Sequence, residues 1–474
     1  MSEHTNEFTQ ERAKTSEHAN EFATVTWKER LSFGAGDLAT NIAWGALATY
    51  VVFFYTDVIG AAASAVGTIV LVVRLADGVV DVGMGAIVDR TSTRWGKARP
   101  WVLRAAVPFA VALVLVFAVP NLGSTATLIY IAVTYLLMNV ALSAAVIPYG
   151  TLNTRMTRDF TERSRLNVTR MFGATLGALI VTVLTLPLVR ALGDNQPAWI
   201  ITFTLFGALA VVLFFITFRN TRERIVDTAP PRNQPGIGEA LKLAGKNRYW
   251  VLLFAIFIVF SIAESLYTGA TAYFAEYFLG DVGFAALMSF MLYIPALIGM
   301  LFMQPVYNRF GKIVPMIVGA GVFLVGSLLI AIDPTNMELA IVGSILRGIG
   351  RIPIFGAIWG MLPDTIEYGE WKSGRRLESV LYSAGSMGQK LGYGLGAALL
   401  GWVMGAAGYN GNKDAQSDSA LNAIEAMFIY VPMALFLLLI ILFWAYRLER
   451  IYPKVEKELA ERRAAADSAQ SASS

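Results

Sequence analysis

The sequence contains no cysteine and only two histidines, His4 and His18. Without cysteine the chain can form no disulfide, thiol nucleophile or Cys-ligated metal site. Both histidines lie in a polar N-terminal stretch, so no apolar segment offers a histidine as a proton relay or as part of a histidine-rich metal site. GxxxxGK[ST], H-E-x-x-H and G-x-S-x-G patterns are also missing, which argues against direct ATP coupling and against an enzyme.

Charge is scarce as well. Charged residues make up 15% of the chain and hydrophobic residues 56%, with a mean hydropathy of +0.56. Soluble domains typically have about 25% charged and about 45–50% apolar residues. The net charge of +4 is spread over short loops and forms no single basic patch, so a nucleic-acid partner is not expected. This composition indicates a polytopic membrane protein.

The apolar residues fall into twelve segments, each long enough to cross a bilayer as a helix of about 20 residues. Their approximate cores are Phe33–Phe54, Val66–Val88, Trp101–Val119, Leu128–Leu152, Val168–Val189, Trp199–Phe218, Trp250–Tyr273, Phe284–Met303, Ile313–Ile332, Leu339–Leu362, Val380–Met404 and Ala423–Trp444. The predicted organisation is a polar tail (1–28), a six-helix half (29–218), a central loop (219–246), a second six-helix half (247–447) and a C-terminal tail (448–474). The first tail repeats Ser2–Phe8 as Ser16–Phe22, and the sequence does not say why.

Basic residues predict the orientation of these spans. They follow every even-numbered span, at Arg90, Arg94, Lys97, Arg99, Arg155, Arg158, Arg163, Arg165, Arg219, Arg222, Arg224, Lys242, Lys246, Arg309, Lys312, Lys372, Arg375, Arg376, Arg447, Arg450, Lys454 and Lys457. The opposite side offers only Arg190 and Lys413. By the positive-inside rule both termini are expected to be cytoplasmic, in the cell (inner or plasma) membrane.

A short internal echo relates the two halves. Arg94-Trp95-Gly96-Lys97 follows span two, and Arg309-Phe310-Gly311-Lys312 follows span eight. Six-span halves with corresponding segments suggest the all-α major facilitator fold.

The second span carries Arg74, Asp77 and Asp81 on one helical face. A charge inside a membrane helix costs about 2.5–3.5 kcal/mol on insertion scales and is functional by default. Carboxylate oxygens suit hard cations, and a buried carboxylate can carry a proton. Asp77 and Asp81 are therefore predicted to bind one H⁺ or Na⁺. The alternative is a structural Arg74–Asp77 ion pair beside a carboxylate at the helix end.

Other polar residues in the spans predict a substrate site. Asp37 and Asn41 share a face of span one, Arg170 begins span five, and Lys390 lies among glycines in span eleven. Such side chains can bind hydroxyl groups. Asp37 and Asn41 could instead form helix–helix hydrogen bonds, and Arg170 could extend to the membrane interface.

Two further sets remain open on sequence alone. Glu264 and Glu276 could pair with Arg347 and Arg351 in span ten. Aromatic side chains that could stack on a sugar, or simply pack, are Tyr149, Tyr267, Phe355 and Trp359.

Four stretches together resemble the glycoside–pentoside–hexuronide:cation symporters, the group that includes the melibiose carrier. They are Gly36–Asn41 with Phe54–Gly60, Arg74–Asp81 running on to Arg94–Trp101, Ile147–Leu152, and Pro363–Glu370 with Lys390 beyond it. The matches spread over nearly the whole membrane portion.

The resemblance implies roles for single residues. Asp77 and Asp81 would be the cation carboxylates, and Ser143 stands where the melibiose carrier has a hydroxyl residue near its cation. Asp37 matches that carrier's sugar-binding aspartate, while Arg170 and Lys390 would face the cavity. Three positions depart from it, because Val146 replaces an aspartate and Gly150 and Phe355 replace tryptophans. These departures argue against melibiose itself, and the first argues against Na⁺.

The sequence thus predicts a monomeric secondary transporter that imports a glycoside or related sugar with H⁺ or Na⁺ by alternating access. Its partners would be the sugar, the coupling cation and the lipid bilayer, with no cofactor. A lysolipid or drug transporter is the alternative within transport, and a non-transporting membrane sensor is the alternative outside it.

Overall fold

The computed structural model describes residues 24–91, 93–157, 160–225, 242, 244–374, 378–413 and 415–473. The two histidines, the repeated N-terminal segment and most of the predicted central loop lie outside these ranges. Within them the secondary structure is helical, apart from an isolated β-bridge between Thr93 and Gly96. The all-α class predicted from composition is confirmed.

The helices divide into two units, each taken here by itself. The first unit holds the chain up to Ala61 and from Val72 through α8, and its helices are α2 (Trp27–Thr49), α3 (Val51–Phe53), the π-helix η1 (Phe54–Val58), most of α4 (Ala63–Arg90), α5 (Arg99–Phe117), α6 (Ser124–Met156), α7 (Phe160–Ala191) and α8 (Gln196–Asn220). The start of α4, within Ala62–Leu71, groups with the second unit. There a Cβ on Gly67 would lie 3.0 Å from the Ala398 carbonyl oxygen.

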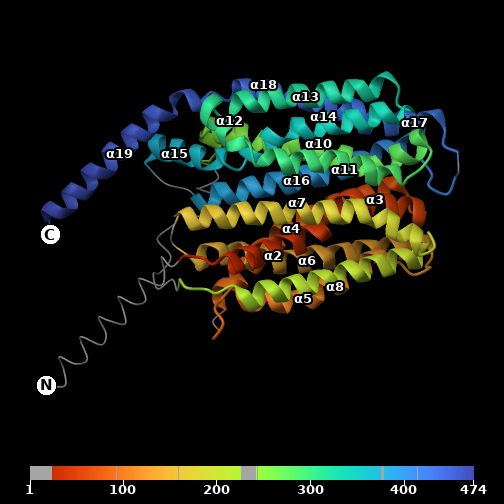
Figure 1. Cartoon of the computed structure of the whole chain (residues 1–474), viewed down its shortest axis with the longest axis horizontal. Helices are drawn as coiled ribbons and strands as arrows, with labels where there is room; N and C mark the ends of the chain where they lie inside the picture. Colours follow the sequence, from red (N-terminus) through yellow and green to blue (C-terminus); the bar gives the residue numbers. More distant parts are fainter. Residues whose placement is uncertain are drawn as a thin grey trace. The chain divides into compact units, whose positions relative to one another are not determined.

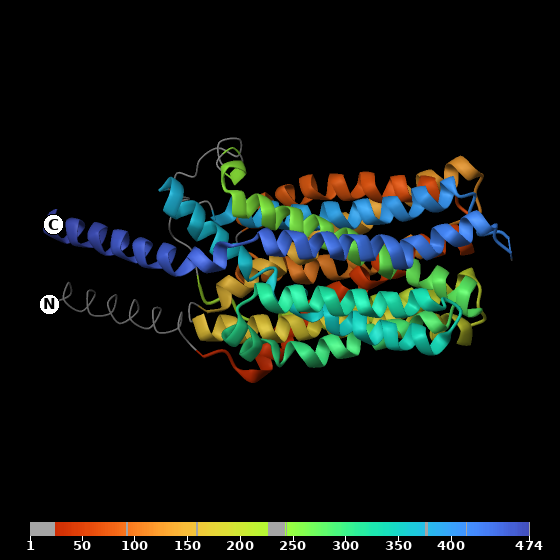
Figure 2. The same cartoon turned by 90° about the horizontal axis from the view of Figure 1, so that it is seen from above.

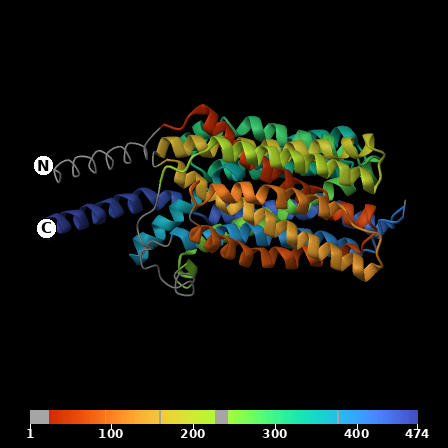
Figure 3. The same ribbon diagram turned by 90° about the horizontal axis from the view of Figure 1, so that it is seen from below.

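The second unit continues from α10 to the last described residue. Its helices are α10 (Arg248–Leu279), α11 (Phe284–Met300), α12 (Met303–Phe310), α13 (Ile313–Ile332), α14 (Met337–Ala357), α15 (Met361–Ser373), α16 (Glu378–Ala406), α17 (Asp418–Glu425), the π-helix η2 (Ala426–Tyr430), α18 (Val431–Ala445) and α19 (Leu448–Ser473). Helices α13 and α14 run side by side (Figures 1 and 2). Helix α19 projects beyond the end of α18 (Figure 3).

The predicted span cores lie mostly on helices, but those of spans one, eight and ten run across breaks, at Tyr50, at residues 301–302 and at residues 358–360. In the part of the chain that the structure describes, nine helices are long and apolar enough to cross a membrane, and up to eleven if two bent pairs each count as one span. These pairs bend by 51° after Thr49 and by 63° after Met300. The remaining predicted core, Val380–Met404, lies within α16. The structure is therefore consistent with twelve spans.

Glycines bring α2 and α7 into close contact. A Cβ on Gly173 would overlap the Gly34 carbonyl oxygen, and one on Gly177 would overlap that of Leu38. Small residues at such contacts let helix backbones approach closely inside a membrane. The contact matters for the site, because α2 carries Asp37 and α7 carries Arg170.

The sequence echo places a glycine with a positive φ before the start of a helix in both units. Gly96 (φ +105°) precedes α5 and Gly311 (φ +74°) precedes α13, both in the left-handed region that favours glycine. The Glu223 carboxylate accepts hydrogen bonds from the backbone N–H groups of Lys97, Ala98 and Arg99 at 3.0, 2.8 and 2.9 Å.

In the second unit Glu449 takes the corresponding position. Its carboxylate accepts from the N–H groups of Lys312 at 2.6 Å and Ile313 at 3.4 Å. A Cβ on Gly311 would contact this carboxylate, as one on Gly96 would contact Glu223. In each unit, therefore, a glutamate that follows the last predicted span core accepts hydrogen bonds from the N–H groups at the start of a helix.

Candidate functional site

Asp77 lies on α4 and is only 2% exposed. Ser143 on α6 donates a hydrogen bond from its Oγ to Asp77 Oδ1 at 2.9 Å. The structure thus brings together two of the three residues predicted to bind the cation. Asp81 follows one helical turn later on the same face of α4 and is partly buried. Two carboxylates and a hydroxyl supply the hard oxygen donors that a proton or an alkali cation requires.

Arg74 lies one turn before Asp77, and its guanidinium is buried against aromatic rings. The guanidinium carbon lies 4.3 Å from the ring centroid of Trp44 on α2 and 6.0 Å from that of Tyr135 on α6. Cation–π contacts of this kind offset part of the cost of burying the charge. Sequence reasoning missed Trp44, although it follows Asn41 by three residues and so shares a helical face with Asp37 and Asn41.

Asp37 is 6% exposed and pairs with Arg170, whose Nε lies 2.9 Å from Asp37 Oδ2. The Thr40 hydroxyl lies 3.3 Å from the other carboxylate oxygen. The Asn41 amide donates to the backbone oxygen of Asp37 at 2.8 Å, which is a hydrogen bond within α2. The Arg170 side chain remains one-third exposed, which leaves part of its guanidinium accessible. Three of the predicted substrate residues therefore lie together on α2 and α7.

Tyr149 joins this cluster from α6. Its ring is fully buried, stacks on Phe33 with 4.7 Å between centroids, and lies 5.5 Å from the guanidinium carbon of Arg170. Its hydroxyl donates to the Phe33 carbonyl at 2.7 Å. A Cβ on Gly36 would lie 2.5 Å from the ring, so glycine is needed there. In this structure the Tyr149 ring packs against Arg170. Packing was one of the two roles that the sequence left open for Tyr149, and stacking on a sugar was the other.

One helix links the two clusters of the first unit. Ser143 and Tyr149 are six residues apart on α6, about 9 Å along the helix axis. A shift of α6 would therefore move the hydroxyl beside Asp77 and the ring beneath Arg170 together.

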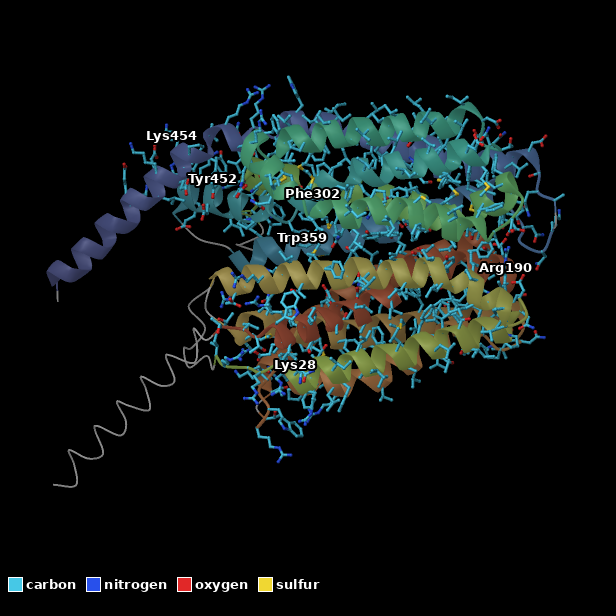
Figure 4. The ribbon with its side chains drawn as sticks, in the orientation of Figure 1. Lys28, Arg190, Phe302, Trp359, Tyr452 and Lys454 are labelled. Carbon is cyan, nitrogen blue, oxygen red and sulfur yellow. The ribbon has the colours of Figure 1, made fainter. Side chains whose placement is uncertain are left out.

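The second unit holds the remaining predicted substrate residues. Phe355 is in the last turn of α14, and Trp359 lies in the short turn before α15 (Figure 4). The Trp359 ring meets Phe257 of α10 edge to face, at 4.8 Å between centroids. Lys390 lies on α16 and is partly buried. Pro353 and the end of α14 at Ala357 interrupt this span beside both aromatic residues.

The structure also decides a pairing that the sequence left open. Glu264 on α10 pairs with Arg351 on α14, with Oε2 and Nη2 2.6 Å apart. Arg347 instead donates from Nε to Ser327 Oγ at 2.9 Å. Glu276 accepts a hydrogen bond from the Val282 backbone N–H at 2.9 Å.

The described residues contain no group of three or more His, Cys, Asp or Glu side chains that could hold a metal ion. The assembled chemistry is thus a set of buried carboxylates, arginines and hydroxyls inside apolar helices. The ion pairs and hydrogen bonds of such a set are of the kind that can hold a small polar ligand.

A family model described as "MFS/sugar transport protein" matches residues 32–450. The chain belongs to this family. This family assignment agrees with two predictions from the sequence: the major facilitator fold, and a transporter function with no enzyme activity.

Curated relatives extend the match over the full membrane portion. The chain is 36% identical to the isoprimeverose transporter of Lactiplantibacillus pentosus, covering 93% of this chain and 92% of that protein. It is 29% identical to the glucuronide carrier protein homolog of Escherichia coli (strain K12), covering 92% and 94%. These relatives confirm the resemblance to the glycoside–pentoside–hexuronide:cation symporters.

Solved structures support the fold. The crystal structure of a D-xylose-proton symporter aligns with a TM-score of 0.64 at 14% identity, covering 89% of this chain and 97% of that one. At this identity the likeness concerns the fold alone. The protein is a multi-pass membrane transporter of the major facilitator type.

Proposed function

We propose that this protein imports a glycoside or related sugar together with a cation, H⁺ or Na⁺, by alternating access. The observation that carries the proposal is the first unit's pair of linked clusters. Asp77 and Ser143 form one, Asp37 and Arg170 form the other, and α6 contributes to both. Relatives named for an isoprimeverose transporter and a glucuronide carrier support a sugar as the cargo.

The cation would bind at Asp77, Asp81 and Ser143. The two carboxylates are one helical turn apart, so a single positive charge between them relieves their mutual repulsion. The Ser143 hydroxyl already donates to Asp77 and would turn its oxygen toward a bound Na⁺. Binding on α4 and α6 then fixes the part of α6 that supports Arg170.

The sugar would bind beside Asp37, Asn41 and Arg170 of the first unit. Phe355, Trp359 and Lys390 of the second unit remain separate candidates for binding sugar. A carboxylate accepts from sugar hydroxyls and a guanidinium donates to their oxygens. Because binding free energies are reciprocal, a cation that tightens sugar binding must itself be bound more tightly when sugar is present, by the same factor.

We further infer that the protein acts as a monomer with both termini in the cytoplasm. The orientation rests on the basic residues that follow the even-numbered spans, where Lys97 and Lys312 sit at the two equivalent turns.

The first experiment uses right-side-out membrane vesicles in weakly buffered, Na⁺-free medium. A panel of glucosides, galactosides, xylosides and glucuronides is added while external pH is recorded. Alkalinisation with one sugar identifies the substrate and H⁺ coupling at once. Uptake that requires added Na⁺ assigns Na⁺ coupling. If no sugar changes the external pH and none is taken up when Na⁺ is added, the proposal is refuted and the lipid or drug alternative is favoured.

A further inference from the structure

The second unit contains an ion pair that the proposed transport cycle does not use. Glu264 is 2% exposed and Arg351 is 5% exposed, in α10 and α14 (Figure 1). Both belong to membrane-spanning helices, where ionisable side chains are costly and mark ion or proton pathways. The Tyr267 hydroxyl, one turn along α10, donates to Glu264 Oε1.

This ion pair is incompletely hydrogen-bonded. Arg351 makes one contact with Glu264, from Nη2, while its Nε and Nη1 are buried and do not bond to Glu264. The Tyr293 hydroxyl is a further hydrogen-bonding neighbour of Arg351. Two parallel hydrogen bonds between the guanidinium and the carboxylate would offset more of the desolvation cost of the two charges than this single contact does. A purely structural pair in this environment could be replaced by apolar residues with little or no loss of stability. Protonation of Glu264 would remove the charge attraction across this single contact and leave Glu264 with its Tyr267 partner.

The rest of the surroundings favour a proton over any other ligand. The other titratable and charged groups near the pair are Tyr293 on α11, Arg347 on α14 and Tyr393 on α16, with Lys390 one turn before Tyr393 on the same helix. The stretch Ala426–Ala445 of η2 and α18, also packed against α10, has no Asp, Glu, Lys, Arg or His. Helix α15 meets α10 near its start, where Tyr368 packs on Tyr249. On α17, Asp418 is exposed and Glu425 accepts from Tyr430.

Glu264 is therefore the one carboxylate among these neighbours, and a metal cation would find no second acidic ligand there. An anion would have to displace a carboxylate that already holds Arg351. A proton needs only one oxygen of Glu264.

We propose that Glu264 is a second proton-binding site, which takes up a proton as its contact with Arg351 opens. The proton adds to a carboxylate oxygen of Glu264, the Arg351 Nη2–Glu264 Oε2 contact breaks, and Tyr267 keeps its hydrogen bond to the other oxygen. This deepens the proposed cation-coupled transport and rests on it for its place in the cycle.

Protonation reaches the substrate region through Arg351. Its guanidinium carbon lies 5.1 Å from the Tyr293 ring centroid and 5.6 Å from that of Phe355. Phe355 is one turn further along α14, just after Pro353, where the helix ends. An arginine released from Glu264 can turn its free N–H groups and shift against Phe355, which changes the end of α14 that carries the predicted sugar residues.

The direct test is infrared difference spectroscopy of the purified protein as the pH is stepped. The expected result is a carboxylic acid C=O band that is lost in Glu264→Gln, shifted in Glu264→Asp and retained in both Glu276→Gln and Asp77→Asn. Glu276 is the matched control, since it lies on the same helix near its exposed end. A spectrum unchanged in Glu264→Gln overturns the proposal. This measurement needs no sugar, so its result is independent of whether the proposed sugar transport is correct.

A transport test then places the site in the cycle. In proteoliposomes, Glu264→Gln is expected to keep sugar counterflow while the pH profile of the counterflow rate differs from that of the wild type. Glu276→Gln should keep the wild-type profile. Loss of counterflow together with sugar binding would make the pair structural and refute the coupling role. If Glu264→Gln does not fold, the double variant Glu264→Gln/Arg351→Met removes both charges and should show the same altered pH profile. A counterflow pH profile identical to that of the wild type in this variant would overturn the proposal.

Discussion

The glutamate that closes the start of α5 offers a quantitative test of the repeated turn. Replacing Glu223 by alanine removes three backbone hydrogen bonds of 2.8–3.0 Å to Lys97, Ala98 and Arg99. A side-chain cap is worth about 1 kcal/mol and a favourable helix-dipole charge about 0.3–1 kcal/mol. Because Glu223 is partly buried and makes three contacts, we expect a loss of about 2 kcal/mol.

The second unit provides the matched control. Glu449 makes one short contact at 2.6 Å and one long contact at 3.4 Å, both near solvent. Glu449→Ala is therefore expected to cost about 1 kcal/mol, half the loss at Glu223. For domains of about 150–250 residues, 1 kcal/mol lowers the melting temperature by about 2–4 °C. Thermal unfolding in detergent, followed by the soluble monodisperse fraction, should thus show the larger shift for Glu223→Ala.

A double-mutant cycle can combine Gly96→Ala with Glu223→Ala, because a Cβ on Gly96 would contact the Glu223 carboxylate. Alanine at φ +105° costs about 1–2 kcal/mol, and its Cβ would displace the Glu223 carboxylate at a further cost of about 2 kcal/mol. In the Glu223→Ala background only the backbone cost remains, so the two substitutions should fall short of additivity by about 2 kcal/mol. Additive effects, or equal shifts for Glu223→Ala and Glu449→Ala, would refute the reasoning.

Further predictions concern the first unit. Asp77→Cys should abolish gradient-driven accumulation in vesicles, and unchanged uphill uptake would contradict the cation assignment. Ser143→Ala removes one hydrogen bond to a carboxylate, about 1.5 kcal/mol, and should weaken cation activation about tenfold in a titration of uptake rate. Asp37→Asn should raise the KM for sugar at least about tenfold, whereas an unaltered KM would remove Asp37 from the site. Gly177→Ala should lower stability by about 1–3 kcal/mol, because its Cβ would overlap the Leu38 carbonyl, and a normal melting temperature would show that α2 and α7 can separate.

The sequence alone was enough to predict the class of the protein. Hydrophobic length, scarce charge and the alternation of basic loops predict a polytopic helical transporter, because a bilayer allows few other arrangements of such a chain. Intramembrane charges stand out against apolar neighbours, so Asp37, Asp77 and Arg170 could be selected one by one. The resemblance then grouped them with a known family, which the comparisons confirm.

Pairing was decided only in three dimensions. Helical periodicity places Asp77 on a face of its own helix, but Ser143 is 66 positions further along the chain and nothing in the sequence signals that the two will meet. Glu264 could have paired with Arg347 or Arg351, and the packing of α10 against α14 places Arg351 within reach of its carboxylate. Likewise, the burial of the Tyr149 ring beside Arg170 depends on Gly36, where a Cβ would overlap that ring. Local sequence thus determined which residues are polar within a span, while the close packing of distant helices determined which of them share a site.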